Sequence, residues 1–231
     1  MFIGHYAVAL AAKRAAPKAS LGTLFLGASF LDLLWPVFLL TGVEHARLTP
    51  GITVMNPLDL YDYPLSHSMA TSLLYSALAA GCYWLVKRYR AGALTLAVCV
   101  FSHWVLDLVS HRPDLPLFPG SSTLVGLSLW NWPVGSIVLE AGMFVAGVWI
   151  YARTTSARDR TGRYAFWSLA AILAIIYTAD LFSSPPPETD IKVIAWTGLG
   201  AILFILWAGW ADRHRKSRVL PASGTSGSTA S

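Results

Sequence analysis

The chain has 231 residues, of which 55% are hydrophobic and 13% are charged, about half the charged fraction of an average soluble domain. This composition excludes disordered and fibrous proteins and argues against an ordinary cytosolic enzyme. The formal net charge of +5 does not indicate nucleic-acid binding, because the Lys and Arg residues lie between apolar segments rather than in one patch.

The apolar residues form segments long enough to cross a membrane. A short segment, residues 2–12, comes first and would reach across about half a bilayer. Segments of roughly 20 residues, the length that spans the hydrocarbon, follow in chain order. They are residues 20–42, 65–86, 92–110, 133–152, 164–182 and 191–211. The sequence therefore predicts an all-α, polytopic helical membrane bundle at residues 1–219, with six full spans and a short N-terminal half-span. Residues 220–231 are predicted to form a disordered polar tail.

The basic residues divide unevenly between the two sides of the predicted bundle. If the half-span points inward and every later segment crosses, all but three of the 17 Lys and Arg residues share one side. The exceptions are Arg47, Arg112 and Lys192. Because cytoplasmic loops carry the Lys and Arg excess, we expect a cytoplasmic C-terminus. The pattern is typical of a multi-pass protein of a bacterial-type cytoplasmic (inner) membrane.

The two longer loops on the opposite side contain acidic residues and prolines. We interpret the first, residues 43–64, as a solvated loop carrying Glu44, His45, Asp59 and Asp62. In the second, residues 112–132, Arg112 is the loop arginine placed to meet an anion.

Ionisable residues occur inside the apolar segments. A charge that faces lipid at the centre of a helix costs about 2.5 kcal/mol or more, so each of these side chains needs a partner, a metal ion or water inside the bundle. They are His5, Asp32, His67, His103, Asp107, Glu140 and Asp180. Asp180 lies near an outer helix end, where an interfacial carboxylate is the simpler interpretation. Counting at 1.5 Å per residue places the others at comparable depths, between about 12 and 30 Å above the basic side.

His103 and Asp107 are four residues apart, so their side chains lie on one face of a helix with Cβ atoms about 5–6 Å apart. That spacing allows both to bind one metal ion, although a structural pair that ties helices together is the alternative. His111 follows on the same face about 12 Å from His103, which places it at the rim of any such site. Ser66 is expected to cap the next helix, with His67 at its start. Nitrogen and oxygen ligands without thiolates favour Zn²⁺, with Mn²⁺ or Fe²⁺ as alternatives.

Four short segments resemble, in this order, the motifs of a family of inner-membrane metal-dependent hydrolases. They are IGHYAVA with His5, FLDLLWP with Asp32, LSHSM with His67, and SHWVLDLVSH with His103 and Asp107. That family is grouped with zinc-dependent phospholipase C and single-strand nucleases, which are soluble all-helical enzymes. The resemblance covers about residues 1–119 and implies that these five residues are metal ligands, with Asp107 bridging two ions. The second His-x-x-x-Glu element of the soluble relatives is missing, because Ser136 precedes Glu140 at that spacing.

Two bound ions would activate a water and hold a phosphoryl oxygen, so phosphoester hydrolysis is the expected reaction. We predict a membrane-embedded metal-dependent hydrolase that acts on a lipid or lipid-linked phosphoester, with Asp107 and Glu140 as catalytic residues. Glu140 could equally support a ligand histidine, relay protons or serve packing. Nucleic acid is not an expected partner, and the oligomeric state is left open.

Two other functions use the same residues. In a proton- or metal-coupled transporter, Asp32, His103, Asp107 and Glu140 would form an ion site or relay between the two leaflets. In a scaffold, buried polar pairs would associate helices. A hydrolase predicts a closed cytoplasmic floor below the site, whereas a carrier needs access from both sides.

Overall fold

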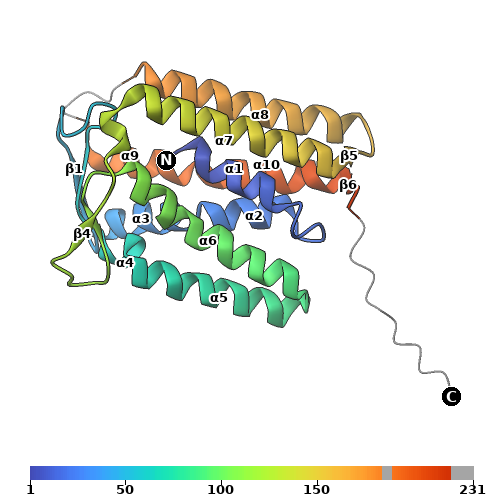
Figure 1. The fold of residues 1–231 in the computed structure, drawn as a ribbon, viewed down its shortest axis with the longest axis horizontal. Helices are drawn as coiled ribbons and strands as arrows, with labels where there is room; N and C mark the ends of the chain where they lie inside the picture. The colour runs from blue at the N-terminus through green and yellow to red at the C-terminus, as the bar shows by residue number, and fades with distance from the viewer. Residues whose placement is uncertain (184–188, 220–231) are drawn as a thin grey trace.

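The computed structural model describes residues 1–183 and 189–219 and forms a bundle of roughly aligned helices (Figure 1). The predicted tail, residues 220–231, lies outside the described residues. The helices are α1 (Ile3–Ala12), α2 (Leu21–Ala28), α3 (Phe30–Thr41), α4 (Pro64–His67), α5 (Met69–Lys87), α6 (Arg90–Ser110), α7 (Pro133–Thr154), α8 (Arg160–Leu181), α9 (Ile191–Leu199) and α10 (Ala201–Arg213). The prediction of a mainly helical membrane bundle is confirmed at this level.

The apolar helices agree with the predicted spans in place and length. Four single helices, α5, α6, α7 and α8, are long and apolar enough to cross a membrane, and α9 with α10 provides a fifth span from Ile191 to Arg213. The pair α2 and α3 forms a sixth candidate, but it is bent by 55°. Helix α1 is apolar and short, as expected of a half-span.

The bend between α2 and α3 falls at Ser29, whose φ of −103° and ψ of 10° depart from the helix. A helix end leaves carbonyl groups without an intrahelical partner. The carbonyl of Ala28, at the end of α2, bonds instead to His103 Nδ1 on α6 at 2.7 Å. The break in this span therefore supplies a backbone acceptor at the height where the buried histidines lie.

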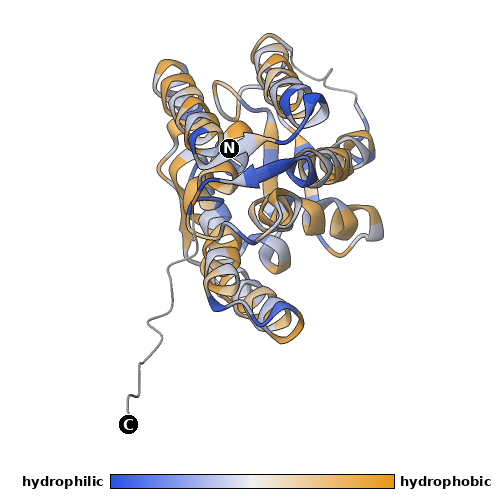
Figure 2. Ribbon diagram, turned by 90° about the vertical axis from the view of Figure 1, so that its right-hand side faces the viewer, coloured by the Kyte–Doolittle hydropathy of each residue, from blue (hydrophilic) through white to orange (hydrophobic). Residues whose placement is uncertain are grey.

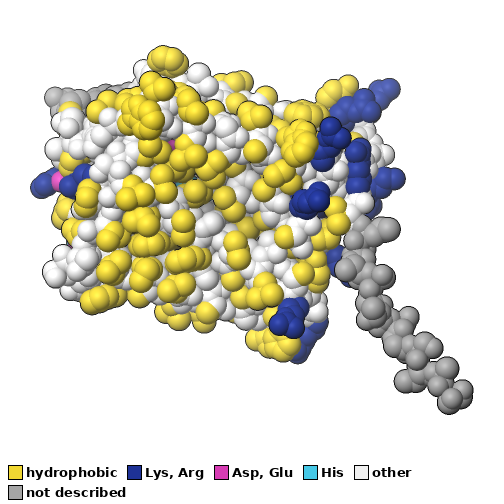
Figure 3. All heavy atoms as spheres, viewed as in Figure 1, with side chains coloured by type: hydrophobic (Ala, Val, Ile, Leu, Met, Phe, Trp, Pro, Cys, Tyr) yellow, Lys and Arg dark blue, Asp and Glu magenta, His cyan; other side chains and the backbone are white. Residues whose placement is uncertain are grey.

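Hydrophobic side chains cover the outside of the bundle as well as its interior. Among the exposed ones are Val86, Val138 and Ile175, which are 76%, 67% and 65% exposed in the isolated chain. Figure 2, which looks along the bundle, shows hydrophobic residues on its helices, and Figure 3 shows them spread over the long side of the molecule. A surface of this kind is stable when hydrocarbon replaces water around it.

Helix α1 packs closely against α7. A Cβ at Gly147 of α7 would lie 2.6 Å from the carbonyl oxygen of Ala7, so only glycine allows this approach. The contact brings the start of α1 beside Glu140, two turns earlier on α7. Glu140 Oε2 accepts hydrogen bonds from the backbone N–H groups of Phe2, at 2.9 Å, and Gly4, at 3.4 Å. This carboxylate therefore satisfies two of the free donors at the start of α1.

Two short hairpins close one end of the bundle, and a pair of strands that are distant in the sequence lies at the opposite end (Figure 1). Strand β1 (His45–Leu48) pairs antiparallel with β2 (Leu58–Asp62), and β3 (Leu115–Pro116) pairs with β4 (Leu124–Val125) before the 3₁₀ turn η1 (Leu129–Asn131). At the far end β5 (Thr155–Ala157) pairs with β6 (Arg215–Ser217).

The interpretation of residues 43–64 as a solvated loop is wrong for two of its acidic residues. Glu44 is fully buried. Its Oε1 accepts hydrogen bonds from the N–H groups of Leu65 and Ser66. Asp59 is 3% exposed and pairs with Arg47 and Arg112. A carboxylate can be buried when such donors satisfy it, and their meeting depends on the folded loop. The ion pair of His45 with Asp62 is exposed, as expected.

Two further expectations about these loops are corrected. Arg112 is not free to meet an anion, since its guanidinium lies 2.6 Å from Asp59 and 3.4 Å from Asp114. Ser66 does not cap the long helix that follows. Ser68 does, with its Oγ accepting from Thr71 N–H at 3.2 Å, while Ser66 lies in the separate turn α4.

Candidate metal centre

Helix α6 provides the centre of the site with His103 and Asp107. Both side chains are buried, and His103 Nε2 lies 3.1 Å from Asp107 Oδ2. His103 Nδ1 donates to the carbonyl oxygen of Ala28, and this bond orients the ring and leaves Nε2 as the nitrogen with a free lone pair. That nitrogen points at the carboxylate, which is the orientation of a metal-binding histidine.

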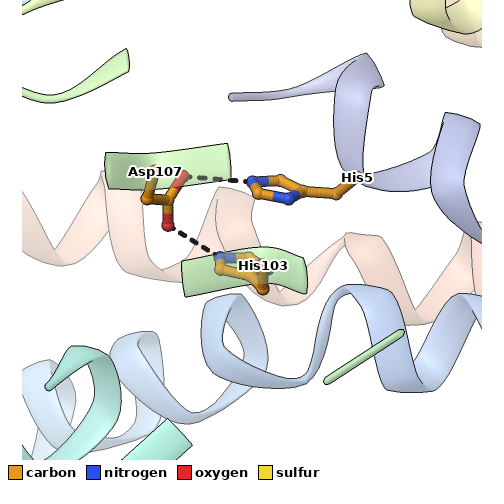
Figure 4. A group of neighbouring side chains, drawn as sticks. All are labelled: His5, His103 and Asp107. Carbon is orange, nitrogen blue, oxygen red and sulfur yellow. Dashed lines mark ion pairs between the residues drawn. The ribbon is translucent and has the colours of Figure 1, made fainter. Parts of the chain in front are cut away.

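Helix α1 brings His5 to the other oxygen of the same carboxylate. His5 Nε2 lies 3.3 Å from Asp107 Oδ1, and the ring of His5 stacks on that of His103 with centroids 3.7 Å apart. Figure 4 shows both imidazoles turned toward Asp107 from two different helices. The amino group of Met1 also donates to Asp107 Oδ1, at 2.9 Å. Asp107 is thus the residue on which α1 and α6 converge.

A second cluster of imidazole and carboxylate side chains includes His103 and residues of α3 and α4. His103 Nε2 lies 3.4 Å from Asp32 Oδ1 on α3, and His67 Nε2 on α4 lies 3.6 Å from the same oxygen. His67 Nε2 is also 3.8 Å from Asp107 Oδ2. Asp32, which has no cation within its own predicted span, therefore meets imidazoles from two other helices.

His67 is oriented by residues outside the metal-binding groups. Its Nδ1 lies 2.7 Å from Ser66 Oγ, and that hydroxyl donates to Glu44 Oε2 at 2.6 Å. Because the hydroxyl proton goes to Glu44, the hydroxyl accepts from Nδ1–H and His67 Nε2 carries the lone pair. A buried carboxylate thus fixes the tautomer of His67 through a serine, as outer carboxylates do for metal-binding histidines.

Two sets of three residues could each hold a metal ion. The ligand atoms of His5, His103 and Asp107 lie within 4.8 Å of one another, and so do those of Asp32, His67 and His103. The sets share His103, and the two oxygens of Asp107 face different sets. All five residues proposed from the sequence as ligands are therefore brought together.

Two buried histidine nitrogens without a hydrogen-bond partner in the described part of the chain are suited to bind a cation. His5 Nε2 and His103 Nε2 are buried and have no hydrogen-bond partner among the residues described. Burying a polar atom without a partner costs free energy, and a lone pair aimed at a carboxylate oxygen is repelled by it. Stacked parallel imidazoles also disfavour two protonated rings, because their charges would lie in contact. A divalent cation between the nitrogens and the carboxylates removes each of these penalties.

Exposure differs sharply among the five residues. The side chain of Asp32 is 48% exposed, whereas those of the other four are between 0% and 5% exposed. Asp32 is therefore the ligand candidate that a molecule entering from outside the bundle would meet. Its exposure is measured on the isolated chain and includes the side that a membrane would cover.

Two residues from the sequence analysis lie beside these sets rather than in them. Glu140 accepts from the N–H groups of Phe2 and Gly4, just before His5 in the chain. It belongs to neither metal-binding set. His111 is closer to the centre than its spacing from His103 indicated. Its Nε2 lies 3.8 Å from Asp107 Oδ1, and its ring packs on Trp130 with centroids 4.3 Å apart.

Two buried side chains from the loops, Asp114 and Tyr63, position His111. Its Nδ1 lies 3.1 Å from Asp114 Oδ1, and Tyr63 donates its hydroxyl to the same oxygen at 2.8 Å. Burial and the neighbouring carboxylate of Asp114 raise the pKa of Tyr63 well above its usual value, so this hydroxyl remains a donor. No sequence pattern indicated these roles of Tyr63 and Glu44, whereas the adjacency of Ser66 and His67 could have suggested their bond.

The half of the bundle between the site and the basic end is filled. Large side chains from α1, α2 and α8 are buried there to 2% exposure or less. They include Leu10, Leu21, Leu24, Phe25, Phe166 and Leu169. The described residues therefore form a packed apolar floor on that side of the histidines.

Comparison with known proteins finds no match for this chain among protein-family models, curated proteins or solved structures.

Proposed function

We propose that this protein is a membrane-embedded metal-dependent hydrolase that acts on a phosphoester of a lipid or lipid-linked substrate. The observation that carries the proposal is the convergence of three imidazoles and two carboxylates in two overlapping sets, each with ligand atoms within 4.8 Å. Zn²⁺ suits the nitrogen and oxygen donors best, with Mn²⁺ or Fe²⁺ as alternatives. The proposal agrees with the resemblance of residues 1–119 to inner-membrane metal-dependent hydrolases.

The residues take different roles in this proposal. When bound, divalent ions would supply an activated water and a Lewis acid for the phosphoryl oxygen. Asp107 presents one carboxylate oxygen to each set, and His103 lies between the sets with its ring fixed by the carbonyl of Ala28. Asp32, the exposed carboxylate, faces the entering substrate. Glu140 acts as a positioning residue, because it holds the backbone that carries His5.

The position of the site supports a substrate from the membrane. His103 and Asp107 lie in the half of α6 that ends at Ser110, beside the two hairpins, and the opposite half of the bundle is packed. Lys and Arg residues gather at the far end, beyond that packing (Figure 3). In this proposal the basic end is cytoplasmic, so the C-terminus lies inside and the metal-binding sets lie in the outer half of the bilayer. We propose the same membrane as from the sequence, a bacterial-type cytoplasmic (inner) membrane.

Analysis of the lipid and water-soluble products of phosphoester hydrolysis tests the proposal directly. The purified full chain, loaded with Zn²⁺, Mn²⁺ or Fe²⁺ in separate samples, is incubated with phosphatidic acid, phosphatidylglycerol, phosphatidylcholine and an isoprenyl diphosphate. Hydrolysis that Asp107→Asn abolishes, and that His45→Ala leaves intact, supports a hydrolase. His45 is a fair control because its ion pair with Asp62 is exposed and belongs to neither metal-binding set. Stoichiometric metal without hydrolysis of any of these lipids would contradict the proposal.

One observation favours the alternative, a proton- or metal-coupled transporter. The span formed by α2 and α3 is bent by 55° three residues before Asp32, and discontinuous helices at ion sites are frequent in transporters. The packed floor argues against a path to the basic end. Zn²⁺ uptake by proteoliposomes, abolished by Asp32→Asn, would favour transport over hydrolysis.

A further inference from the structure

A polar hollow lies at the basic end of the bundle, away from the candidate metal centre. Its volume is about 320 Å³, and it opens between the start of α2 and the turn that joins α5 to α6. Its lining residues share a polar or aromatic character and are Lys18, Ser20, Thr23, Tyr83, Lys87 and Tyr89. The hollow is large enough for a phosphate with part of a headgroup, and its wall carries two positive charges.

The aromatic wall of the hollow is built into the fold. Tyr83 and Tyr89 both pack on Gly92, since a Cβ there would lie 2.7 Å from one ring and 2.5 Å from the other. The turn between α5 and α6 is fixed by Arg88, which takes a left-handed conformation with φ of 50°. Lys18 Nζ lies 5.7 Å from the centroid of the Tyr89 ring. The two tyrosine rings therefore give the hollow one wall with a fixed position, and the exposed side chains of Lys18 and Lys87 lie at its rim.

The two lysines of the hollow lack a carboxylate partner. Neither Lys18 nor Lys87 has an acidic oxygen within 4.0 Å in the part of the chain that the structure describes. Another lysine at this end differs, because Lys13 is buried and bonds Asp212 at 2.6 Å. Two ammonium groups that share a cavity repel each other unless an anion lies between them.

The surroundings of the hollow match the lipid–water boundary. Lys87 ends α5, and the residues just before it, Leu85 and Val86, are 58% and 76% exposed. Trp84 lies one turn earlier, and tryptophan and lysine mark the headgroup level of a membrane. A lipid whose phosphate enters the hollow can lay its acyl chains along this apolar face of α5.

We propose that this hollow binds the phosphate of an anionic phospholipid headgroup. Lys18 and Lys87 supply the charge. The hydroxyl groups of Ser20 and Thr23 bond each other at 2.8 Å, which leaves one O–H donor for a phosphate or headgroup oxygen. The two tyrosine rings form the wall beside the headgroup. This lipid is structural or regulatory, and its site is distinct from the metal-binding sets.

Native mass spectrometry of the full chain in detergent tests the site. The protein is mixed with equal amounts of phosphatidylglycerol and phosphatidylcholine, and the retained lipid is compared with that of Lys18→Gln/Lys87→Gln. Preferential retention of phosphatidylglycerol by the unmodified chain, weakened roughly 10- to 30-fold in this variant, is expected for two lysines near the headgroup. Lys18→Arg/Lys87→Arg keeps the charge and should restore retention.

Matched controls distinguish a specific site from general attraction to a basic surface. Lys216→Gln/Arg218→Gln removes the same charge from exposed residues at the same end, and it should leave retention unchanged. Asp107→Asn should also retain the lipid, which separates this proposal from the metal centre. Equal losses in both glutamine variants, or equal retention of the two lipids by the unmodified chain, would overturn it. Displacement of phosphatidylglycerol by inorganic phosphate alone would assign the hollow to free phosphate and also overturn it.

Discussion

The imidazole rings of His5 and His103 lie parallel, with an angle of 1° between their planes and 3.7 Å between their centroids. They come from α1 and α6 and reach the two oxygens of one carboxylate, that of Asp107. Both rings therefore aim a nitrogen at the same buried carboxylate, which also accepts from the amino group of Met1. This relationship places two imidazole nitrogens and a carboxylate where together they could hold one metal ion.

The first prediction concerns metal content. His103→Ala removes the residue shared by both sets, so it should lose nearly all bound metal, whereas His67→Ala, which removes a member of one set, should lose about half. Elemental analysis of protein purified with metal in excess measures both losses. His45→Ala is the control, and substoichiometric metal in the unmodified chain would remove the basis for the proposed chemistry.

The second prediction concerns Glu140 as a positioning residue. Glu140→Ala leaves the N–H groups of Phe2 and Gly4 without their acceptor and frees the segment that carries His5. Loss of a residue that orients a ligand lowers metal affinity about 10- to 100-fold, and Glu140→Gln, which retains an acceptor oxygen, should restore part of it. Competition with a chromophoric chelator gives the affinities. If both variants lose hydrolysis but keep full metal affinity, Glu140 acts on the substrate instead.

Sequence reasoning selected the five residues that the structure brings together, because each carries a local signal. An ionisable side chain in an apolar span needs a partner, and the spacing of His103 and Asp107 places both on one face. The half-span and the longer spans followed from the lengths of apolar segments. The bend at Ser29 was not predicted. Gly27 lies two residues before it, but the backbone acceptor that the bend provides meets His103 only in the folded chain.

The loops were harder to predict for a different reason. Glu44 and Asp59 belong to polar segments that resemble solvated loops, and their burial depends on donors at Ser66 and Arg112. These pairs are separated by 22 and 53 residues. No local pattern in a single sequence reports such contacts, so the support for His67 became visible only with the structure.

The third prediction concerns the Ser66 hydroxyl that links His67 to Glu44. Ser66→Ala removes the hydroxyl between His67 and Glu44 and leaves Glu44 Oε2 without its donor. We expect metal affinity to fall about 10- to 100-fold because the ring of His67 is no longer fixed. Ser68→Ala is the matched control, since it affects the cap of α5 rather than the ligand. An unchanged affinity in Ser66→Ala would show that the Ser66 hydroxyl does not orient a metal ligand.

The fourth prediction concerns pH and the basic end. Asp159 caps α8 and lies 2.8 Å from His214, and the hydrogen bond to His214 holds the pKa of Asp159 below its ordinary value of 3.8. A lowered carboxyl pKa stabilises the fold above the unfolded value, and this contribution disappears as the pH falls through the folded one. Asp159→Asn keeps a capping side chain but removes the charge. Its melting temperature should lie below that of the unmodified chain at neutral pH, and the difference should vanish in acid; a difference independent of pH would contradict the assignment.

The last prediction concerns the contact between α1 and α7. Gly147→Ala places a Cβ 2.6 Å from the carbonyl oxygen of Ala7, and backbone cannot yield as a flexible side chain does. Forcing the helices apart should lower the free energy of unfolding by about 1–3 kcal/mol and move His5 away from Asp107. Gly142→Ala lies on the same helix and meets nothing within 4 Å, so it should be neutral or stabilise the helix by about 0.5–1 kcal/mol. Thermal unfolding in detergent measures both, and metal content reports the displacement of His5. Because the same contact places Glu140 at the start of α1, a loss of metal in Gly147→Ala without a loss in Gly142→Ala would link helix packing to the candidate site.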